Sequence, residues 1–258
     1  CQLGGFPGHS MMNFMRRALF ASLVALLLVA CASTPPAATH VRIALVGDST
    51  QTERQGYGTG FCANMTAQVD CVNRAKGGAS TKTYRRDGLW AAALATKPDW
   101  MLIQFGHNDV QGPTHDDRET DLQTEYPENL RNFVREARAA GIHPILVTPI
   151  ARRYFQADGK IHDDLMGHVA AMKAVAAEMN VPLIDLHTLS QDYLEQIGEV
   201  KGNTLGATKL DGKGNTVPDK THFNLAGSYV FGRIVAEAMA RTVPELAQYV
   251  KPVAAVAP

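Results

Sequence analysis

Three polar residues of this sequence have the types and the order that nucleophilic catalysis needs. Ser49 follows a short apolar run, and Asp219 and His222 stand three residues apart near the C-terminus. A serine hydroxyl becomes a nucleophile when a base takes its proton, and a carboxylate can hold that base in the required tautomer. We therefore expect Ser49 as nucleophile, His222 as base and Asp219, from the same short loop, as the group that orients His222. The alternative is a turn serine and two solvated loop residues.

Acyl transfer also needs hydrogen-bond donors for the negative charge that develops on the carbonyl oxygen. The sequence offers three candidates, which are the backbone N–H of Ser49, the backbone N–H of Gly78 and the side-chain amide of Asn108. Gly78 and Asn108 also have a structural explanation, because glycine supplies the positive φ of a turn and asparagine tolerates it. The residues alone leave both explanations open.

Strands alternating with helices would position these residues. Short apolar runs, typical of strands covered on both faces, occur at residues 41–46, 69–75, 100–105, 144–148 and 181–186. Helical spacing of apolar residues occurs at residues 89–96, 125–140, 163–179 and 224–241, with Asn224 as an N-cap. The alternation predicts a doubly wound α/β domain with a mostly parallel sheet. Residues 199–218, rich in Gly, Lys, Asn and Thr, are expected to form a surface loop.

The candidate residues fall where such a sheet would bring them together. Ser49 follows the first predicted strand, Gly78 the second and Asn108 the third. Ligands of open α/β sheets bind beyond the carboxyl ends of the strands. We therefore expect one site at this edge of the sheet.

Four short segments resemble the sequence blocks of the GDSL esterases, also called SGNH hydrolases. They are G-D-S at 47–49, the second glycine of K-G-G-A-S at 76–80, G-H-N-D at 106–109 and D-K-T-H at 219–222. The resemblance implies a flavodoxin-like three-layer α/β/α fold with a five-stranded sheet. It also implies Ser49, His222 and Asp219 as catalytic residues, and Ser49, Gly78 and Asn108 as the oxyanion hole. No metal or organic cofactor is expected.

The flanking residues resemble the rhamnogalacturonan acetylesterase branch of that family. The resemblance lies in F-G-H-N-D at 105–109, Tyr126 with N-L at 129–130, T-P-I-A-R-R at 148–153 and T-H-F at 221–223. It implies hydrolysis of O-acetyl esters on pectic polysaccharide. One departure is Ala79, because many members have arginine directly after the glycine of the second block. The alternatives are a lipase, lysophospholipase or thioesterase of the same fold, and a noncatalytic carbohydrate-binding lipoprotein.

His107 and Arg152 are candidate substrate contacts. His107 lies beside Asn108, and the pair Arg152 and Arg153 could hold the carboxylates of uronates. The alternative is that His107 is a structural partner in its turn and that the two arginines brace the loops around them. Asp48 and Asp109 are expected to brace loops by hydrogen bonds rather than to donate protons.

The N-terminal residues indicate export. Arg16 and Arg17 precede a short apolar run that ends in L-V-A-C at 28–31, which looks like a bacterial lipobox. We expect residues 1–30 to be a pre-region and signal peptide, Cys31 to be lipidated, and residues 31–40 to form a tether. The alternative is ordinary cleavage after A-C-A at 30–32. The folded domain would then span residues 41–250, followed by a tail at 251–258, in the bacterial cell envelope or secreted.

Composition narrows the choice of partners. The chain has 258 residues, with 25 Lys and Arg against 25 Asp and Glu, so its formal net charge is zero. A neutral chain gives no indication of nucleic-acid binding or of a basic membrane-binding face. We expect an acetylated carbohydrate as substrate, membrane contact only through the lipid anchor, and a monomer.

Cys62 and Cys71 are expected to form a disulfide. Export to an oxidising compartment favours pairing of the two cysteines that remain beside Cys31 in the mature chain. The bridge would join a helix to the next strand, and the alternative is two buried free thiols. The sequence has no C-x-x-C or H-x-x-x-H spacing, so we expect no metal site.

Overall fold

The computed structural model describes residues 40–112, 117–162 and 164–253. These residues belong to a single structural unit that extends from Ala38 to Pro258. The predicted signal peptide, the predicted lipidation site Cys31, residues 31–39 of the predicted tether and residues 254–258 lie outside the described residues. Among the helices that are described, none is both long enough and apolar enough to cross a membrane.

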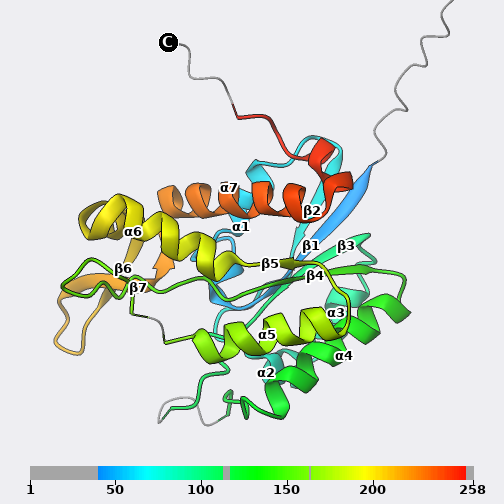
Figure 1. Ribbon diagram of the computed structural model, residues 1–258, viewed down its shortest axis with the longest axis horizontal. Coiled ribbons are helices and arrows are strands. Elements are labelled where there is room, and N and C mark those ends of the chain that lie inside the picture. The colour runs from blue at the N-terminus through cyan, green and yellow to red at the C-terminus, as the bar shows by residue number, and fades with distance from the viewer. Residues whose placement is uncertain (1–39, 113–116, 163, 254–258) are drawn as a thin grey trace, which may run out of the picture. The chain divides into compact units, whose positions relative to one another are not determined.

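A five-stranded parallel sheet forms the centre of the fold (Figure 1). Its strands are β1 (Val41–Gly47), β2 (Val69–Asn73), β3 (Trp100–Gln104), β4 (His143–Val147) and β5 (Leu183–Ile184). Their order is β2-β1-β3-β4-β5, and every pairing is parallel. This is the strand order of flavodoxin-like folds, so the predicted fold class is confirmed.

Apolar side chains on both faces of the strands explain why helices cover both faces of the sheet. Ile43 and Leu45 of β1 belong to one buried core cluster, whereas Ala44 and Val46 belong to the other. Side chains alternate between the two faces of a strand, so a continuous apolar run contributes side chains to both core clusters. The prediction of strands buried on both faces is therefore confirmed for β1.

Helices form a layer on each face of the sheet. One face is covered by α1 (Gly58–Ala63), α6 (Leu186–Thr204), α7 (Leu225–Thr242) and the 3₁₀ helix η2 (Pro244–Tyr249). The other face is covered by α2 (Thr81–Arg86), α3 (Leu89–Leu94), α4 (Glu125–Ala139) and α5 (Met166–Glu178). Figure 1 shows α6 and α7 above the sheet and α4 and α5 below it.

The helix boundaries follow from local hydrogen bonds. Asn224 accepts a hydrogen bond from the Gly227 N–H at 3.0 Å, which confirms it as the N-cap of α7. Asp185 caps α6 in the same way by accepting from the Thr188 N–H. That cap lies inside the strand predicted at residues 181–186, which shortens β5 to two residues. The helix predicted at 163–179 begins only at Met166.

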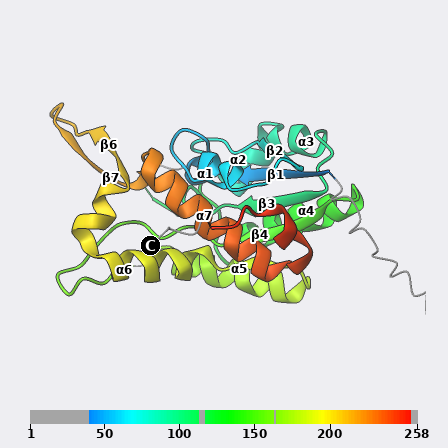
Figure 2. The same cartoon turned by 90° about the horizontal axis from the view of Figure 1, so that it is seen from above.

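A hairpin replaces the surface loop predicted at residues 199–218. Helix α6 continues to Thr204, and β6 (Gly206–Leu210) then pairs antiparallel with β7 (Thr216–Phe223). In the turn, Asp211 Oδ1 accepts the backbone N–H groups of Lys213 and Asn215, each at 2.8 Å. Asp219 and His222 therefore lie on a strand. The expectation that a short loop carries both residues was wrong. Figure 2 shows this ribbon at the left end of the view, leading into α7.

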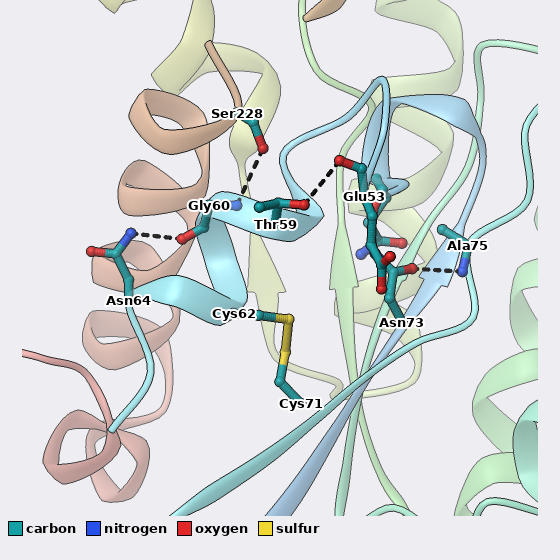
Figure 3. The surroundings of a disulfide bond; sticks show 10 residues. Glu53, Thr59, Gly60, Cys62, Asn64, Cys71, Asn73, Ala75 and Ser228 are labelled. Atoms are coloured by element: carbon teal, nitrogen blue, oxygen red, sulfur yellow. Dashed lines mark hydrogen bonds between the residues drawn. A yellow bond between two sulfur atoms is a disulfide. The ribbon is translucent and has the colours of Figure 1, made fainter. Parts of the chain in front are cut away.

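A disulfide joins Cys62 of α1 to Cys71 of β2, as predicted (Figure 3). Their Cα atoms are 5.7 Å apart. Close by, the Asn73 side chain donates to the Gln51 carbonyl at 3.0 Å. Gln51 ends the 3₁₀ helix η1 (Ser49–Gln51), so β2, the strand that carries Cys71, is hydrogen-bonded to the segment that begins at Ser49.

Candidate active site

Ser49, His222 and Asp219 form a continuous hydrogen-bonded chain. Ser49 Oγ lies 2.8 Å from His222 Nε2, and His222 Nδ1 lies 2.8 Å from Asp219 Oδ2. A carboxylate at Nδ1 requires a proton on that nitrogen, which leaves Nε2 as the acceptor for the serine proton. The three side chains thus have the geometry of a nucleophile, a general base and a group that orients the base.

The end of β1 presents Ser49 to this chain. Asp48 caps the short helix η1, because its Oδ1 accepts from the Thr50 N–H at 2.9 Å and from the Thr50 hydroxyl at 2.8 Å. Ser49 is the first residue of η1 and its side chain makes no cap. Its Oγ is therefore available to His222.

Hydrogen bonds from neighbouring N–H groups stabilise the charged form of Asp219. Its Oδ1 accepts from the backbone N–H groups of Thr221 at 2.8 Å and His222 at 3.0 Å. Burial alone would raise the pKa of Asp219, but the backbone and ring hydrogen bonds of His222 and the Thr221 N–H lower this pKa to about 2. The carboxylate is therefore ionised at neutral pH and holds His222 Nδ1 as a donor.

The loop after β2 passes beside Ser49. A Cβ atom placed on Gly77 would lie 3.9 Å from Ser49 Cβ, and Gly78 has a φ of +77°. Within the described part of the chain, the N–H groups of Ser49 and Gly78 donate to no protein acceptor. Asn108 Nδ2 donates to the Ala79 carbonyl at 3.0 Å, which leaves its second N–H for another acceptor. These N–H groups are therefore candidate donors for an oxyanion hole.

The match to a known family agrees with this geometry. The sequence profile of the GDSL-like Lipase/Acylhydrolase family matches residues 44–229, a range that contains Ser49, Gly78, Asn108, Asp219 and His222. The chain belongs to this family. Within the matched range, Ser49 follows β1 directly and is not surrounded by a G-x-S-x-G turn.

Two relatives of this GDSL-like chain come from Bacillus subtilis (strain 168). The chain is 34% identical over 208 residues to the probable rhamnogalacturonan acetylesterase YesY, covering 78% of this chain and 92% of that protein. It is also 34% identical over 210 residues to the rhamnogalacturonan acetylesterase RhgT, covering 76% and 88%. The solved structure of YxiM from B. subtilis superimposes with a TM-score of 0.65 at 28% identity, covering 79% of this chain and 57% of that chain.

Arg118 contacts the loop that contains Gly78. In this loop Ala79 stands where an arginine would follow the glycine in the branch that the sequence resembles. Arg118 Nη1 donates to the Asn108 Oδ1 at 3.3 Å and lies 3.5 Å from the Gly78 carbonyl. It therefore contacts both candidate oxyanion residues, from 40 positions after Gly78 and 10 positions after Asn108. No sequence signal marks Arg118, because its partners belong to other loops.

His107 and Arg152 are in contact with each other and with acidic residues. The His107 ring is buried, with Nδ1 3.4 Å from Asp48 Oδ2. Arg152 forms an ion pair with Asp164 and donates to the His107 carbonyl at 3.3 Å. Their roles as substrate contacts therefore stay predictions, and bracing of the loop after β3 is what their present contacts provide.

Asp109 braces the loops around the GDSL-like site, as predicted. Its Oδ1 accepts from the backbone N–H of Thr81 at 3.0 Å and from the hydroxyl groups of Thr81 and Thr120 at 2.5 and 3.2 Å. Burial raises the pKa of Asp109 from 3.8 to about 7 against these hydrogen bonds, and the charge of Asp48 adds to the increase. Across the described ranges, no group of three or more His, Cys, Asp or Glu side chains could hold a metal ion.

Proposed function

We propose that this protein is a serine esterase that removes O-acetyl groups from pectic polysaccharide through an acetyl-enzyme on Ser49. The observation that carries the proposal is the pair of 2.8 Å contacts that joins Ser49 Oγ to His222 and His222 to Asp219. The substrate class comes from the names of the two relatives at 34% identity, both rhamnogalacturonan acetylesterases.

In the first half of the reaction, His222 Nε2 takes the Ser49 proton as Oγ bonds to the acetyl carbonyl carbon. The carbonyl electron pair moves onto oxygen, where the N–H groups of Ser49 and Gly78 and the Asn108 amide donate to it. The bond from carbon to the sugar oxygen then breaks, and protonated His222 gives its proton to that oxygen. The products are a free sugar hydroxyl and acetyl-Ser49.

In the second half, water replaces the sugar. His222 takes a proton from water, whose oxygen bonds to the acetyl carbon. The bond to Ser49 Oγ breaks, and His222 returns the proton to Oγ, which releases acetic acid and restores the site. Asp219 keeps its charge throughout and stabilises the imidazolium of His222 in both halves.

The cavities near the site favour a small acyl group over a long one. A cavity of about 140 Å³ lies beside Gly77 and Gly78, and its lining includes the charged side chains of Lys76, Arg86 and Arg118. Ligand pockets are usually several hundred Å³ in volume, so this cavity is too small to hold a long acyl chain. This supports an acetyl ester over the lipase, lysophospholipase or thioesterase alternative.

A larger cavity suits the carbohydrate portion of the substrate. Its volume is about 650 Å³, and it lies between the segment after η1 and the β6–β7 hairpin. Its lining residues are Arg54, Gln55, Ala207, Thr208, Phe223 and Asn224. Phe223 and Asn224 directly follow His222, so a polysaccharide chain in this cavity would pass close to the catalytic base.

Acetate release from a panel of esters tests the function. The panel contains acetylated rhamnogalacturonan, acetylated homogalacturonan, acetylated xylan and short lipid esters, each assayed with wild type and with Ser49→Ala. We expect the fastest release from an acetylated pectic polymer and none with the folded Ser49→Ala variant. Fastest turnover of a long acyl chain would favour the lipase class, and binding to pectin without acetate release would favour a noncatalytic lipoprotein.

We further propose that residues 1–30 are removed on export and that lipidated Cys31 and the tether at 31–40 anchor a monomeric domain, residues 41–250, in the cell envelope. The support is the lipobox-like L-V-A-C at 28–31. Mass spectrometry of the mature N-terminus should find a lipid on Cys31, and Cys31→Ser should move the protein to the soluble fraction. An N-terminus at Ser33 would instead indicate soluble export, and light scattering of the mature domain tests the monomer.

A further inference from the structure

Arg153 is a charged side chain with no exposed surface. Removing a guanidinium from water costs free energy unless strong hydrogen bonds replace the lost hydration. Burial lowers the pKa of Arg153 to about 10, against the opposing effect of the Asp219 carboxylate, so the group stays protonated at neutral pH. The contacts of Arg153 must therefore offset at least part of the cost of burying its charge.

The contacts of Arg153 are backbone carbonyls of β7. Its Nη2 donates to the carbonyl oxygens of Asp219 and His222, both at 2.5 Å. Its own backbone N–H donates to the carbonyl of Lys220, between them, at 2.8 Å. One arginine therefore holds the main chain of both Asp219 and His222.

The side chain fits a closely packed slot between the hairpin and the core. Its Cζ lies 4.9 Å from the centroid of the Phe223 ring, and that ring packs on Phe231 of α7 at 4.5 Å. On the opposite strand, a Cβ atom added to Gly206 would lie 2.7 Å from Arg153 Nη2. The glycine therefore leaves the room that the guanidinium occupies.

We propose that Arg153 is a positioning residue, which fixes the backbone of Asp219 and His222 so that their side chains reach each other and Ser49 in the geometry that proton transfer needs. The inference rests on the proposed function, because it gives Arg153 a role in the reaction of that site. The planar fork of arginine donates in two fixed directions from one nitrogen, whereas lysine offers a mobile point charge. We therefore expect that lysine cannot replace arginine at this position.

Two substitutions test the inference from opposite sides of the slot. Arg153→Lys keeps the charge and removes the fork. Gly206→Ala keeps Arg153 but places a Cβ atom 2.7 Å from its Nη2 and 3.1 Å from the Asp219 carbonyl oxygen, so it disturbs the hydrogen bond between them. Gly212→Ala is the matched control, because Gly212 lies in the turn of the same hairpin and an added Cβ would meet nothing within 4 Å. Each variant is assayed for kcat and KM on a small acetyl ester and for its rate of labelling at Ser49 by an organophosphonate. Its thermal unfolding is also measured, and proton NMR follows the His222 Nδ1–H.

We expect kcat and the labelling rate to fall together by about 10- to 100-fold in both test variants, with KM unchanged. The His222 Nδ1–H signal should broaden in both, and Gly212→Ala should match wild type. If Arg153→Lys does not fold, Gly206→Ala gives the same test. Wild-type kcat, labelling and NMR signal in a folded variant, with only a lower unfolding temperature, would overturn the positioning role.

The labelling assay separates this inference from the proposed substrate. Wild type that is labelled at Ser49 but releases no acetate from pectic esters would end the proposed function, while the comparison of labelling rates would still decide the role of Arg153. Wild type that is not labelled at Ser49 would overturn both.

Discussion

Ser49 Oγ and His222 Nε2 lie 2.8 Å apart although 173 residues separate them along the chain. The contact depends on bringing the end of β1 beside the end of β7. A direct backbone tie supports it, because the Phe223 N–H donates at 2.9 Å to the carbonyl of Gln55, in the segment that follows the nucleophile. The segments that carry Ser49 and His222 are therefore joined by a main-chain hydrogen bond as well as by these two side chains.

Asp219→Asn should separate the tautomer role of Asp219 from its structural role. The asparagine oxygen can still accept from the Thr221 and His222 N–H groups, but its NH₂ would face His222 Nδ1 and favour the wrong tautomer. We expect kcat to fall by about 10³- to 10⁴-fold, with little change in unfolding temperature. The measurement is kcat on an acetyl ester alongside thermal unfolding. A variant with near wild-type kcat would remove Asp219 from the mechanism.

Arg118→Ala should weaken the oxyanion hole indirectly. The variant loses the 3.3 Å hydrogen bond to Asn108 Oδ1, but Asn108 keeps its bond to the Ala79 carbonyl. We expect kcat to fall about tenfold, and Asn108→Ala to lower it by about 10²- to 10³-fold. Arg135→Ala, which removes an exposed arginine paired with Glu128 on α4, serves as control and should leave kcat unchanged. Equal activity of Arg118→Ala and Arg135→Ala would contradict this account of Arg118.

The sheet and the residues at its edge could be predicted because they follow from local patterns. Ser49, Gly78 and Asn108 each come shortly after an apolar run, and the carboxyl ends of parallel strands meet at one edge. Asn224 could be predicted as a cap because its side chain bonds to a backbone N–H only three residues away. In each of these predictions the relevant information lies within a few neighbouring residues.

The hairpin and the bracing arginines could not be predicted for the opposite reason. The last three residues of β6, Thr208–Leu210, are exposed, so no apolar alternation distinguishes them from a loop. Arg153 bonds to carbonyl oxygens 66 and 69 residues away, and carbonyls carry no residue type that a sequence could reveal. Asp219 and His222 were correctly paired by their spacing, but the strand that holds them depends on pairing with β6.

Removing the Cys62–Cys71 disulfide should lower stability. The bridge closes a short loop with a sequence separation of 9, for which restriction of the unfolded chain contributes about 2–3 kcal/mol. Denaturant unfolding of a Cys62→Ser, Cys71→Ser double variant should show this loss, and wild type treated with a reducing agent should match the variant. Equal unfolding free energies of oxidised wild type and the double variant would contradict the prediction.

Asp109 should make stability depend on pH. Because its pKa is raised to about 7, the native state keeps a proton between pH 3.8 and about 7 that the unfolded chain has released. The stabilisation from Asp109 is therefore complete below this range and is lost as the pH rises through it. The side chain that replaces Asp109 in the Asp109→Asn variant is neutral at every pH. The unfolding free energy of wild type minus that of this variant should therefore fall as the pH rises from 3.8 to about 7. Denaturant unfolding across the range measures it, and a constant difference would contradict the raised pKa.

On the proposed function, acetyl groups leave the pectic polymer through a covalent bond to Ser49. Rapid-quench mass spectrometry of the wild-type enzyme mixed with acetylated rhamnogalacturonan tests this directly. We expect an acetyl group on the peptide that contains Ser49 at early times, before free acetate reaches its steady rate, and none in Ser49→Ala. Acetate release by Ser49→Ala at the wild-type rate, or an acetyl group that forms on a different residue, would contradict it.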